Sequence, residues 1–234
     1  MIISHKYKYI FFKTSKTAGT SIEISLSRFC DKDDVITPID RRSREIMKEL
    51  GIFSQNYTRP LKIAEYKPRD FLSLITPWEK NPEKQLFGSH TKARELKNLI
   101  APEIWDNYFK FCFVRNPWDR AISQYYYVKS LGRAENLEDF FKKKDPSTNY
   151  QIYTIDDKIA MDFVGKYENL IEDLGIICNK LNIPFDNWLP NALGNIRTDR
   201  RHYSEILTEA QANLIREKCA KEIEWFGYEF ERKK

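Results

Sequence analysis

The segment from Tyr7 to Ser27 constrains the fold of this chain most strongly, because it combines a strand, a polar turn and a helix. Its first six residues are aromatic and β-branched apart from one lysine, which is the composition of a short buried strand. The turn runs from Lys13 to Gly19, and apolar residues then recur at helical spacing from Ile22 to Phe29. We therefore expect the turn to lead directly into the N-terminus of a helix near Thr20.

A turn of this kind can hold an anion. The first N–H groups of a helix have no partners within the helix, and the helix dipole adds partial positive charge there. Lys16 contributes a full charge, and Thr20 and Ser21 contribute hydroxyl donors. The segment predicts a phosphate-binding loop, although Lys16 and Ser21 could also simply complete a turn and cap a helix.

A second strand and helix, between Tyr108 and Tyr127, carry further anion-binding residues. Apolar residues from Phe109 to Val114 predict a buried strand, and Pro117 suits the first turn of a helix. Ser123 falls in the second turn, and side chains of a helix tilt towards its N-terminus. We expect Arg115 and Ser123 to converge on one anion; a solvent-facing helix serine is the alternative for Ser123.

The rest of the chain alternates short apolar segments with amphipathic ones. Strands are expected at Met161–Lys166 and within Leu86–His90, where a short strand should end in a polar turn. Helices are expected at Arg41–Leu50, at Ala93–Asp106 with an interruption at Pro102, at Glu168–Leu181 and at Glu209–Glu224. This alternation predicts an α/β fold of the P-loop-like type, with three layers and a central, mostly parallel sheet flanked by helices. The 234 residues fit a single domain, 1–234, of ordinary size.

Composition excludes several classes of protein. No apolar run reaches the roughly 20 residues of a membrane span, and lysines interrupt the N-terminal apolar residues, unlike a signal peptide. The net charge of +5 and pI near 8.8 suit an anionic ligand better than a nucleic acid. Four widely spaced cysteines without a CxxC pair predict reduced thiols in a cytoplasmic protein, with no disulfide framework and no metal site.

The two loops differ from those of a nucleoside triphosphatase. Lys16 precedes Gly19, and no glycine stands at the loop entry, so the turn is not a Walker A motif. A triphosphatase commonly ends the second strand with an aspartate that helps to hold Mg²⁺. Here that position is Arg115, which cannot ligate a metal and instead pairs with phosphate. Phosphate binding through protein donors, and group transfer without a metal, are therefore expected.

The segments KTAGTS (Lys16–Ser21) and FVRNPWDRAISQYY (Phe113–Tyr126) resemble the two cofactor signatures of sulfotransferases that use 3′-phosphoadenosine 5′-phosphosulfate (PAPS). The similarity is greatest to the carbohydrate branch, which contains the heparan sulfate 2-O-sulfotransferases and bacterial relatives (sulfotransferase family 2). GSHTKARELK around His90, DFVGKYENLIEDL (Asp162–Leu174) and the terminal IEWFGYEF extend the resemblance over most of the chain.

The resemblance implies a role for each matched residue. Backbone N–H groups of Thr17, Ala18 and Gly19, with the hydroxyls of Thr20 and Ser21, would hold the 5′-phosphosulfate. Lys16 would stabilise charge on the leaving oxygen, and His90 would remove the proton of the acceptor hydroxyl. The remaining ligands would be Arg115 and Ser123 for the 3′-phosphate, Tyr167 for the adenosine, and a basic loop containing Arg197, Arg200 and Arg201 that closes over the cofactor. The product would be 3′,5′-ADP.

Several points stay open at the level of the sequence. His202 is a second candidate for the base, and Tyr125, Tyr126 and Tyr127 suit the core better than an acceptor platform. The irregular segment of about 41–85 is either a surface loop or the border of an acceptor site.

The acceptor is expected to be a small molecule or a glycan, and the oligomeric state is undetermined. Two other classes of protein remain possible, namely a P-loop kinase with a degenerate loop and a non-catalytic module that binds polyanions.

Overall fold

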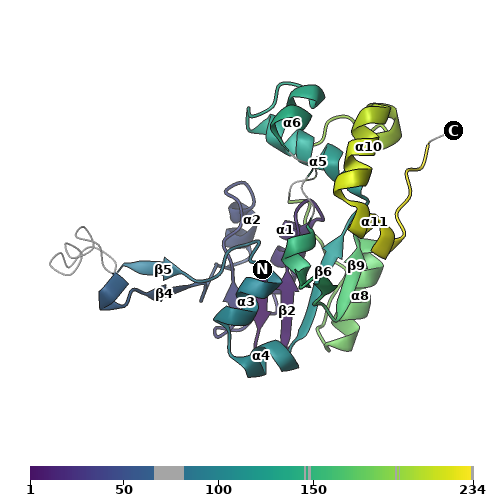
Figure 1. Cartoon of the computed structure of the whole chain (residues 1–234). Helices are drawn as coiled ribbons and strands as arrows, with labels where there is room; N and C mark the ends of the chain where they lie inside the picture. The colour runs from purple at the N-terminus through teal and green to yellow at the C-terminus, as the bar shows by residue number, and fades with distance from the viewer. Residues whose placement is uncertain (66–81, 145, 147–148, 193, 195, 233–234) are drawn as a thin grey trace.

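A five-stranded sheet forms the centre of the molecule in a computed structural model, which describes residues 1–65, 82–144, 146, 149–192, 194 and 196–232 (Figure 1). The strands lie in the order β3-β1-β2-β6-β9. Their bounds are β1 Ile2–Ser4, β2 Tyr9–Phe12, β3 Val35–Ile36, β6 Phe109–Val114 and β9 Phe163–Lys166. β2, β6 and β9 pair in parallel, whereas β1 is antiparallel to both β2 and β3. All strands of this sheet except β1 therefore run in the same direction, so the sheet is mostly parallel, as expected.

Alternation of side chains along β2 and β6 gives the sheet two apolar faces. Ile10 and Phe12 lie in one core cluster together with Cys112, while Tyr9 and Phe11 lie in the other. Tyr9–Phe12 and the last four residues of β6 are buried on both faces, which explains why these sequences are continuously apolar. The third strand, β9, follows the same alternation.

Helices cover both faces and complete three layers. One face packs against α1 (Gly19–Ser27) and α8 (Leu170–Lys180), and the other against α3 (Ala93–Leu99), α4 (Pro102–Asn107), α7 (Tyr150–Tyr153) and α11 (Ala220–Phe226). The apolar faces of α1 and α8 meet Phe111 and Phe113 of β6. The architecture is thus the expected P-loop-like α/β fold.

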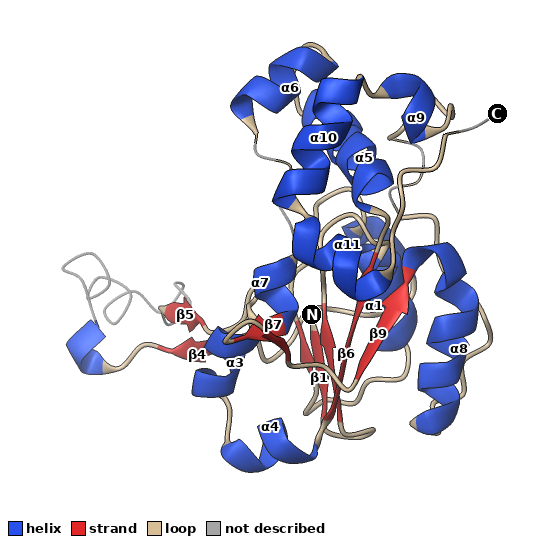
Figure 2. Ribbon diagram, turned by 45° about the vertical axis from the view of Figure 1, so that its right-hand side comes forward, coloured by secondary structure: helices blue, strands red, loops and turns tan. Residues whose placement is uncertain are grey.

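A separate group of helices stands above the carboxyl ends of the parallel strands (Figure 2). It consists of α5 (Pro117–Ser130), α6 (Leu137–Lys143), α9 (Tyr203–Ile206) and α10 (Glu209–Lys218). Trp118 and Ile122 of α5 pack against Ile215 of α10 and Tyr203 of α9. Asn116 caps α5, since its side chain accepts hydrogen bonds from the N–H groups of residues 118 and 119. This packing fixes α5 above the end of β6.

Two short hairpins lie outside the central sheet. One pairs β4 (Thr58–Pro60) with β5 (Glu83–Gln85) and extends away from the sheet (Figure 1), and the 3₁₀ turn η1 (Ile63–Glu65) follows β4. The other pairs β7 (Thr154–Ile155) with β8 (Lys158–Ile159). The short strand expected at the start of Leu86–His90 is wrong, because the ladder ends at Gln85 and Phe87 is buried by packing on the core rather than by pairing. The polar turn expected at its end is present at Ser89 and His90.

Two helices also differ from expectation. The last long helix divides at Cys219, since α10 packs against α5 whereas Trp225 and Phe226 of α11 pack on the sheet. α2 spans only Arg44–Glu49, because the Asp40 carboxylate binds the N–H groups of Arg42 and Ser43 in a turn before it. The basic residues 67 and 69 of the predicted irregular segment lie outside the described residues.

None of the four cysteines, all of which the structure describes, forms a disulfide, and three of them are buried. Among the described residues, no helix combines the length and apolar character needed to span a membrane.

Candidate active site

The residues that follow the carboxyl ends of the parallel strands line one cavity of about 1230 Å³. β2 leads into Lys13, β6 into Arg115 and β9 into Tyr167, and all three residues line the cavity. Ligand sites in open α/β sheets commonly lie at this end of the strands. The predicted residues that line it are Lys16, Ala18, Gly19, Thr20, Ser21, His90, Arg115, Ser123, Tyr167, Arg197, Arg200, Arg201 and His202.

Thr17 is the exception among the predicted residues. Its side chain is buried, and its hydroxyl lies 2.8 Å from the hydroxyl of Thr14. Thr14 in turn donates a hydrogen bond to the carbonyl of Phe113. The two threonines therefore join the loop after β2 to strand β6.

The loop has an unusual backbone. Lys16 and Ala18 adopt the left-handed conformation, with φ of 64° and 58°. A left-handed backbone conformation costs free energy in residues other than glycine, and it persists where surrounding contacts impose it. Asn149 supplies two such contacts: it accepts from the N–H of Ser15 at 2.8 Å and donates to the carbonyl of Ser15 at 2.9 Å.

We expect Asn149→Ala to lower the free energy of unfolding by about 2–4 kcal/mol, because the backbone N–H and the backbone carbonyl of Ser15 both lose a buried partner. Denaturant unfolding measures this change. Asn107→Ala is the matched control, since Asn107 is exposed and bonds only the carbonyl of Glu103 among the described residues. A loss no larger than that of the control would contradict the role assigned to Asn149.

The N-terminus of α1 faces the same cavity. Ala18 precedes the helix and has no polar side chain to cap it, and the first turn carries no acidic residue. The first N–H groups of the helix therefore remain available to an anion from the cavity. Gly19 is needed for close packing: a Cβ there would lie 2.7 Å from Cγ of Lys13 and 3.2 Å from the carbonyl oxygen of Thr14.

The ammonium of Lys16 lies 4.4 Å from the ring centroid of Tyr127 on α5. Burial, followed by repulsion from Arg115, lowers the pKa of Lys16 to about 8. The expectation that Tyr125, Tyr126 and Tyr127 belong to the core is confirmed for Tyr125, whereas Tyr127 lines the cavity. The cation–π contact holds the lysine inside the cavity.

Arg115 is held on three sides. Its Nε and Nη2 lie 2.8 Å and 2.6 Å from Oδ2 of Asp119, and its Nη1 donates to the carbonyl of Lys16 at 2.9 Å. Its guanidinium also lies over the ring of Tyr167, with its central carbon 3.9 Å from the centroid. Arg115 thus connects the two predicted anion sites, and it covers one face of the predicted adenosine contact.

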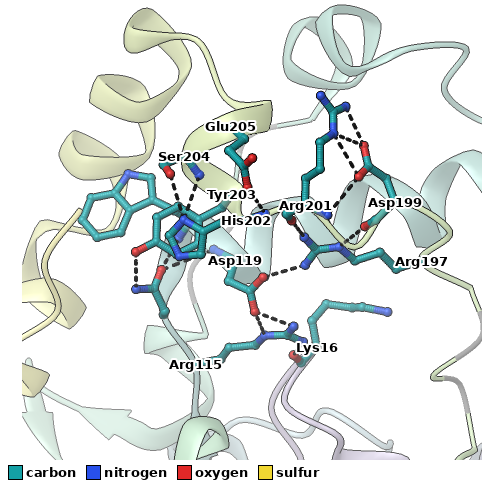
Figure 3. Close-up of polar contacts among 12 residues, drawn as sticks. Lys16, Arg115, Asp119, Arg197, Asp199, Arg201, His202, Tyr203, Ser204 and Glu205 are labelled. Atoms are coloured by element: carbon teal, nitrogen blue, oxygen red, sulfur yellow. Dashed lines mark hydrogen bonds and ion pairs between the residues drawn. The ribbon is translucent and has the colours of Figure 1, made fainter. Parts of the chain in front are cut away.

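The basic loop lies beside Asp119 and Arg115 (Figure 3), and its residues Arg197, Arg200 and Arg201 line the cavity. Arg197 pairs with Asp119, and Arg201 pairs with Asp199. Arg200 donates to the carbonyl of Gly194 at 3.0 Å. Arg200 and Arg201 are exposed, whereas Arg197 points inward and is mostly buried.

His90 has a defined tautomer. Its Nδ1 lies 2.8 Å from the carbonyl oxygen of Lys13, which can only accept, so Nδ1 carries a proton and Nε2 of the neutral ring is an acceptor. The side chain is exposed at the cavity wall, but the surrounding protein removes enough water to lower its pKa below the ordinary value. His202 instead caps α9 through Ser204, and its ring packs at a tilt against the ring of Tyr203.

Three residues of the site were not predicted from the sequence. Asp119 stands four positions after Arg115, the spacing of an ion pair along a helix, and this signal could have identified it. Asn149 and Tyr127 carry no such signal, because their contacts join distant segments. Within the described residues, no three side chains of the types His, Cys, Asp and Glu form a group that could hold a metal ion.

Comparison with known proteins agrees with this geometry. Residues 1–229 match the profile described as "Sulfotransferase family". The chain therefore belongs to the sulfotransferase family, and it is a sulfotransferase enzyme. It is also 33% identical over 103 residues to a protein of Archaeoglobus fulgidus described as "Uncharacterized protein", and the match covers 38% of this chain and 80% of that protein.

Proposed function

We propose that this enzyme transfers the sulfuryl group of PAPS to a hydroxyl of a carbohydrate acceptor without the help of a metal. The observation that carries the proposal is the direct link between two anion sites in one cavity, made by the hydrogen bond from Arg115 to the carbonyl of Lys16. PAPS carries anionic groups at both its 5′ and 3′ positions. A loop with available N–H groups and an arginine in the same cavity suit a ligand of this kind.

The residues present fit this donor. The N–H groups from Thr17 to Gly19 and the hydroxyls of Thr20 and Ser21 bind the 5′-phosphosulfate. Arg115 and Ser123 bind the 3′-phosphate. Arg115 has five N–H groups and uses three of them on other residues that the structure describes, so within that part of the chain two remain for a phosphate. Tyr167 contacts the adenosine, and Arg200 and Arg201 close over it.

PAPS supplies an activated sulfuryl group whose departure leaves 3′,5′-ADP. Lys16 stabilises negative charge on the bridging oxygen as that bond breaks. His90 accepts the proton of the acceptor hydroxyl at Nε2, while its Nδ1–H stays bonded to the carbonyl of Lys13. The sulfuryl group passes directly from phosphate to hydroxyl, and no residue of the chain forms a covalent intermediate.

The polar lining of the cavity that contains His90 suits a sugar. Ser15, Asp40 and Gln124 line it with hydroxyl, carboxylate and amide groups, and Tyr127 adds an aromatic ring. Such groups form hydrogen bonds with the hydroxyls of a sugar. The described residues from 41 to 85 do not line the cavity, although their neighbours Asp40 and Ser89 do.

A transfer assay with labelled PAPS and a set of glycosides and glycans tests the proposal. Sulfated product should form in the presence of EDTA, and 3′,5′-ADP should inhibit. Tight Mg²⁺-dependent ATP binding without affinity for 3′,5′-ADP would instead indicate a kinase. Salt-dependent heparin binding that ignores 3′,5′-ADP would indicate a polyanion-binding module.

The dependence of kcat/KM on pH is expected to be bell-shaped. His90 acts in its neutral form, so activity rises with pH through its lowered pKa, below about pH 6.5. Lys16 acts in its charged form, so activity falls as pH rises through its pKa of about 8. In Lys16→Arg the alkaline limb should disappear, because a guanidinium stays protonated. A wild-type profile that stays level through pH 8 would contradict the titration assigned to Lys16.

A further inference from the structure

The carboxylate of Asp119 lies between two arginines that come from different parts of the chain (Figure 3). Its Oδ2 accepts from Nε of Arg115 at 2.8 Å, and its Oδ1 accepts from Nη1 of Arg197 at 2.6 Å. The side chain of Arg115 is only 10% exposed, that of Asp119 24% and that of Arg197 15%. Water therefore screens these pairs less than it screens surface ion pairs.

The two arginines lower the pKa of Asp119, although its burial acts in the opposite direction. The carboxylate is consequently ionised throughout the neutral range. It holds one arginine with each oxygen, so the loss of its charge affects both contacts together.

Arg197 supports the basic loop. Its Nε donates to the carbonyl of Asp199 at 2.8 Å, and its Nη2 donates to the carbonyl of Arg201 at 2.6 Å. Each nitrogen of its guanidinium therefore contacts protein, two of them the loop backbone. The contact with Asp119 attaches this folded loop to α5, which leaves Arg200 and Arg201 at the cavity.

We propose that Asp119 is a positioning residue that couples the 3′-phosphate site to the basic loop. It orients Arg115 on one side and anchors the loop through Arg197 on the other. An anion bound at Arg115 then favours the closed loop, and the closed loop favours that anion by the same factor. The proposal rests on the proposed function for the identity of this anion, the 3′-phosphate of the donor.

The affinity for nucleotides tests the coupling. In Asp119→Asn the Kd of 3′,5′-ADP should rise about 10- to 100-fold, as expected when charge-assisted contacts are lost. The Kd of 5′-AMP, which lacks the 3′-phosphate, should change about 3-fold or less on the same reasoning. Equal losses for both nucleotides would contradict the proposal, as would an unchanged or a tighter Kd for 3′,5′-ADP.

Limited trypsin digestion tests the anchor independently of the donor. The loop contains Arg197, Arg200 and Arg201, and cleavage there separates a C-terminal fragment that mass spectrometry identifies. Asp119→Asn should accelerate this cleavage several-fold without nucleotide, and 3′,5′-ADP should protect the wild type more than the variant. Unchanged cleavage would overturn the anchor. Faster cleavage in a protein whose wild type does not bind 3′,5′-ADP would overturn the proposed function and the coupling to it, but not the anchor.

Three further variants complete the design. Asp139→Asn is the matched control, since Asp139 pairs with Lys143 at the surface of α6, away from the cavity. Arg197→Met tests the other half of the pair, and its effect on 3′,5′-ADP should not add to that of Asp119→Asn. Asp119→Glu keeps the charge and should restore part of the affinity. Full additivity, or no recovery by glutamate in a protein with wild-type melting behaviour, would contradict the coupling.

Discussion

Lys16→Met is expected to lower kcat by about 10²- to 10³-fold, the usual cost of removing one donor that stabilises charge in a transition state. Methionine keeps an unbranched apolar stem beside Tyr127, so the loop should retain its shape. In the wild type the ammonium of Lys16 acts on the leaving oxygen, whereas the N–H groups of the loop and Arg115 hold the donor in the ground state. The Kd of 3′,5′-ADP should consequently change only a few-fold.

Steady-state transfer from PAPS and equilibrium binding of 3′,5′-ADP measure the two quantities separately. Lys129→Met is a close control, because Lys129 also lies over a tyrosine of α5, with its ammonium 5.6 Å from the ring centroid of Tyr125, but is exposed. The control should keep wild-type activity. Equal activity of Lys16→Met and the wild type would overturn the assigned mechanism.

His90→Asn is expected to lower kcat by about 10²- to 10⁴-fold, the range that a positioned general base contributes. The amide of asparagine can still donate a hydrogen bond to the carbonyl of Lys13 in place of Nδ1, but it cannot accept a proton at neutral pH. Stability and nucleotide binding should stay close to the wild type. The residual activity of this variant should show no acid limb in its pH profile.

His202→Asn distinguishes between the two histidines. Asparagine is a favourable N-cap residue, so α9 should keep its capped start. Activity within a few-fold of the wild type is expected for this variant. The reverse pattern, with a large loss in His202→Asn and little in His90→Asn, would assign the base to His202.

Local sequence patterns identified the elements that form the site. The apolar runs that became β2 and β6 are buried on both faces of the sheet, and such strands have a recognisable composition. The turn before α1 and the position of Arg115 after β6 follow from chain order alone. Parallel pairing of β2 and β6 then brings Lys16 and Arg115 to the same cavity.

Long-range contacts could not be predicted in this way. β5 pairs with β4 and ends at Gln85, just before the strand expected within Leu86–His90. Pairing between segments far apart in the sequence decides where such a polar strand lies. Asn149 holds Ser15 across 134 positions, and Arg197 reaches Asp119 across 78. No periodicity or local spacing connects such residues.

The kind of site was therefore encoded locally: a strand, a turn with a lysine, an uncapped helix start, and an arginine at the end of a neighbouring strand. Those features depend on residues within a few positions of one another, where propensity and spacing act directly. The tautomer of His90, the lowered pKa of Lys16 and the link from Asp119 to the basic loop depend on folding. They arise because packing of remote segments removes water from charged groups and sets which atoms lie within hydrogen-bonding distance.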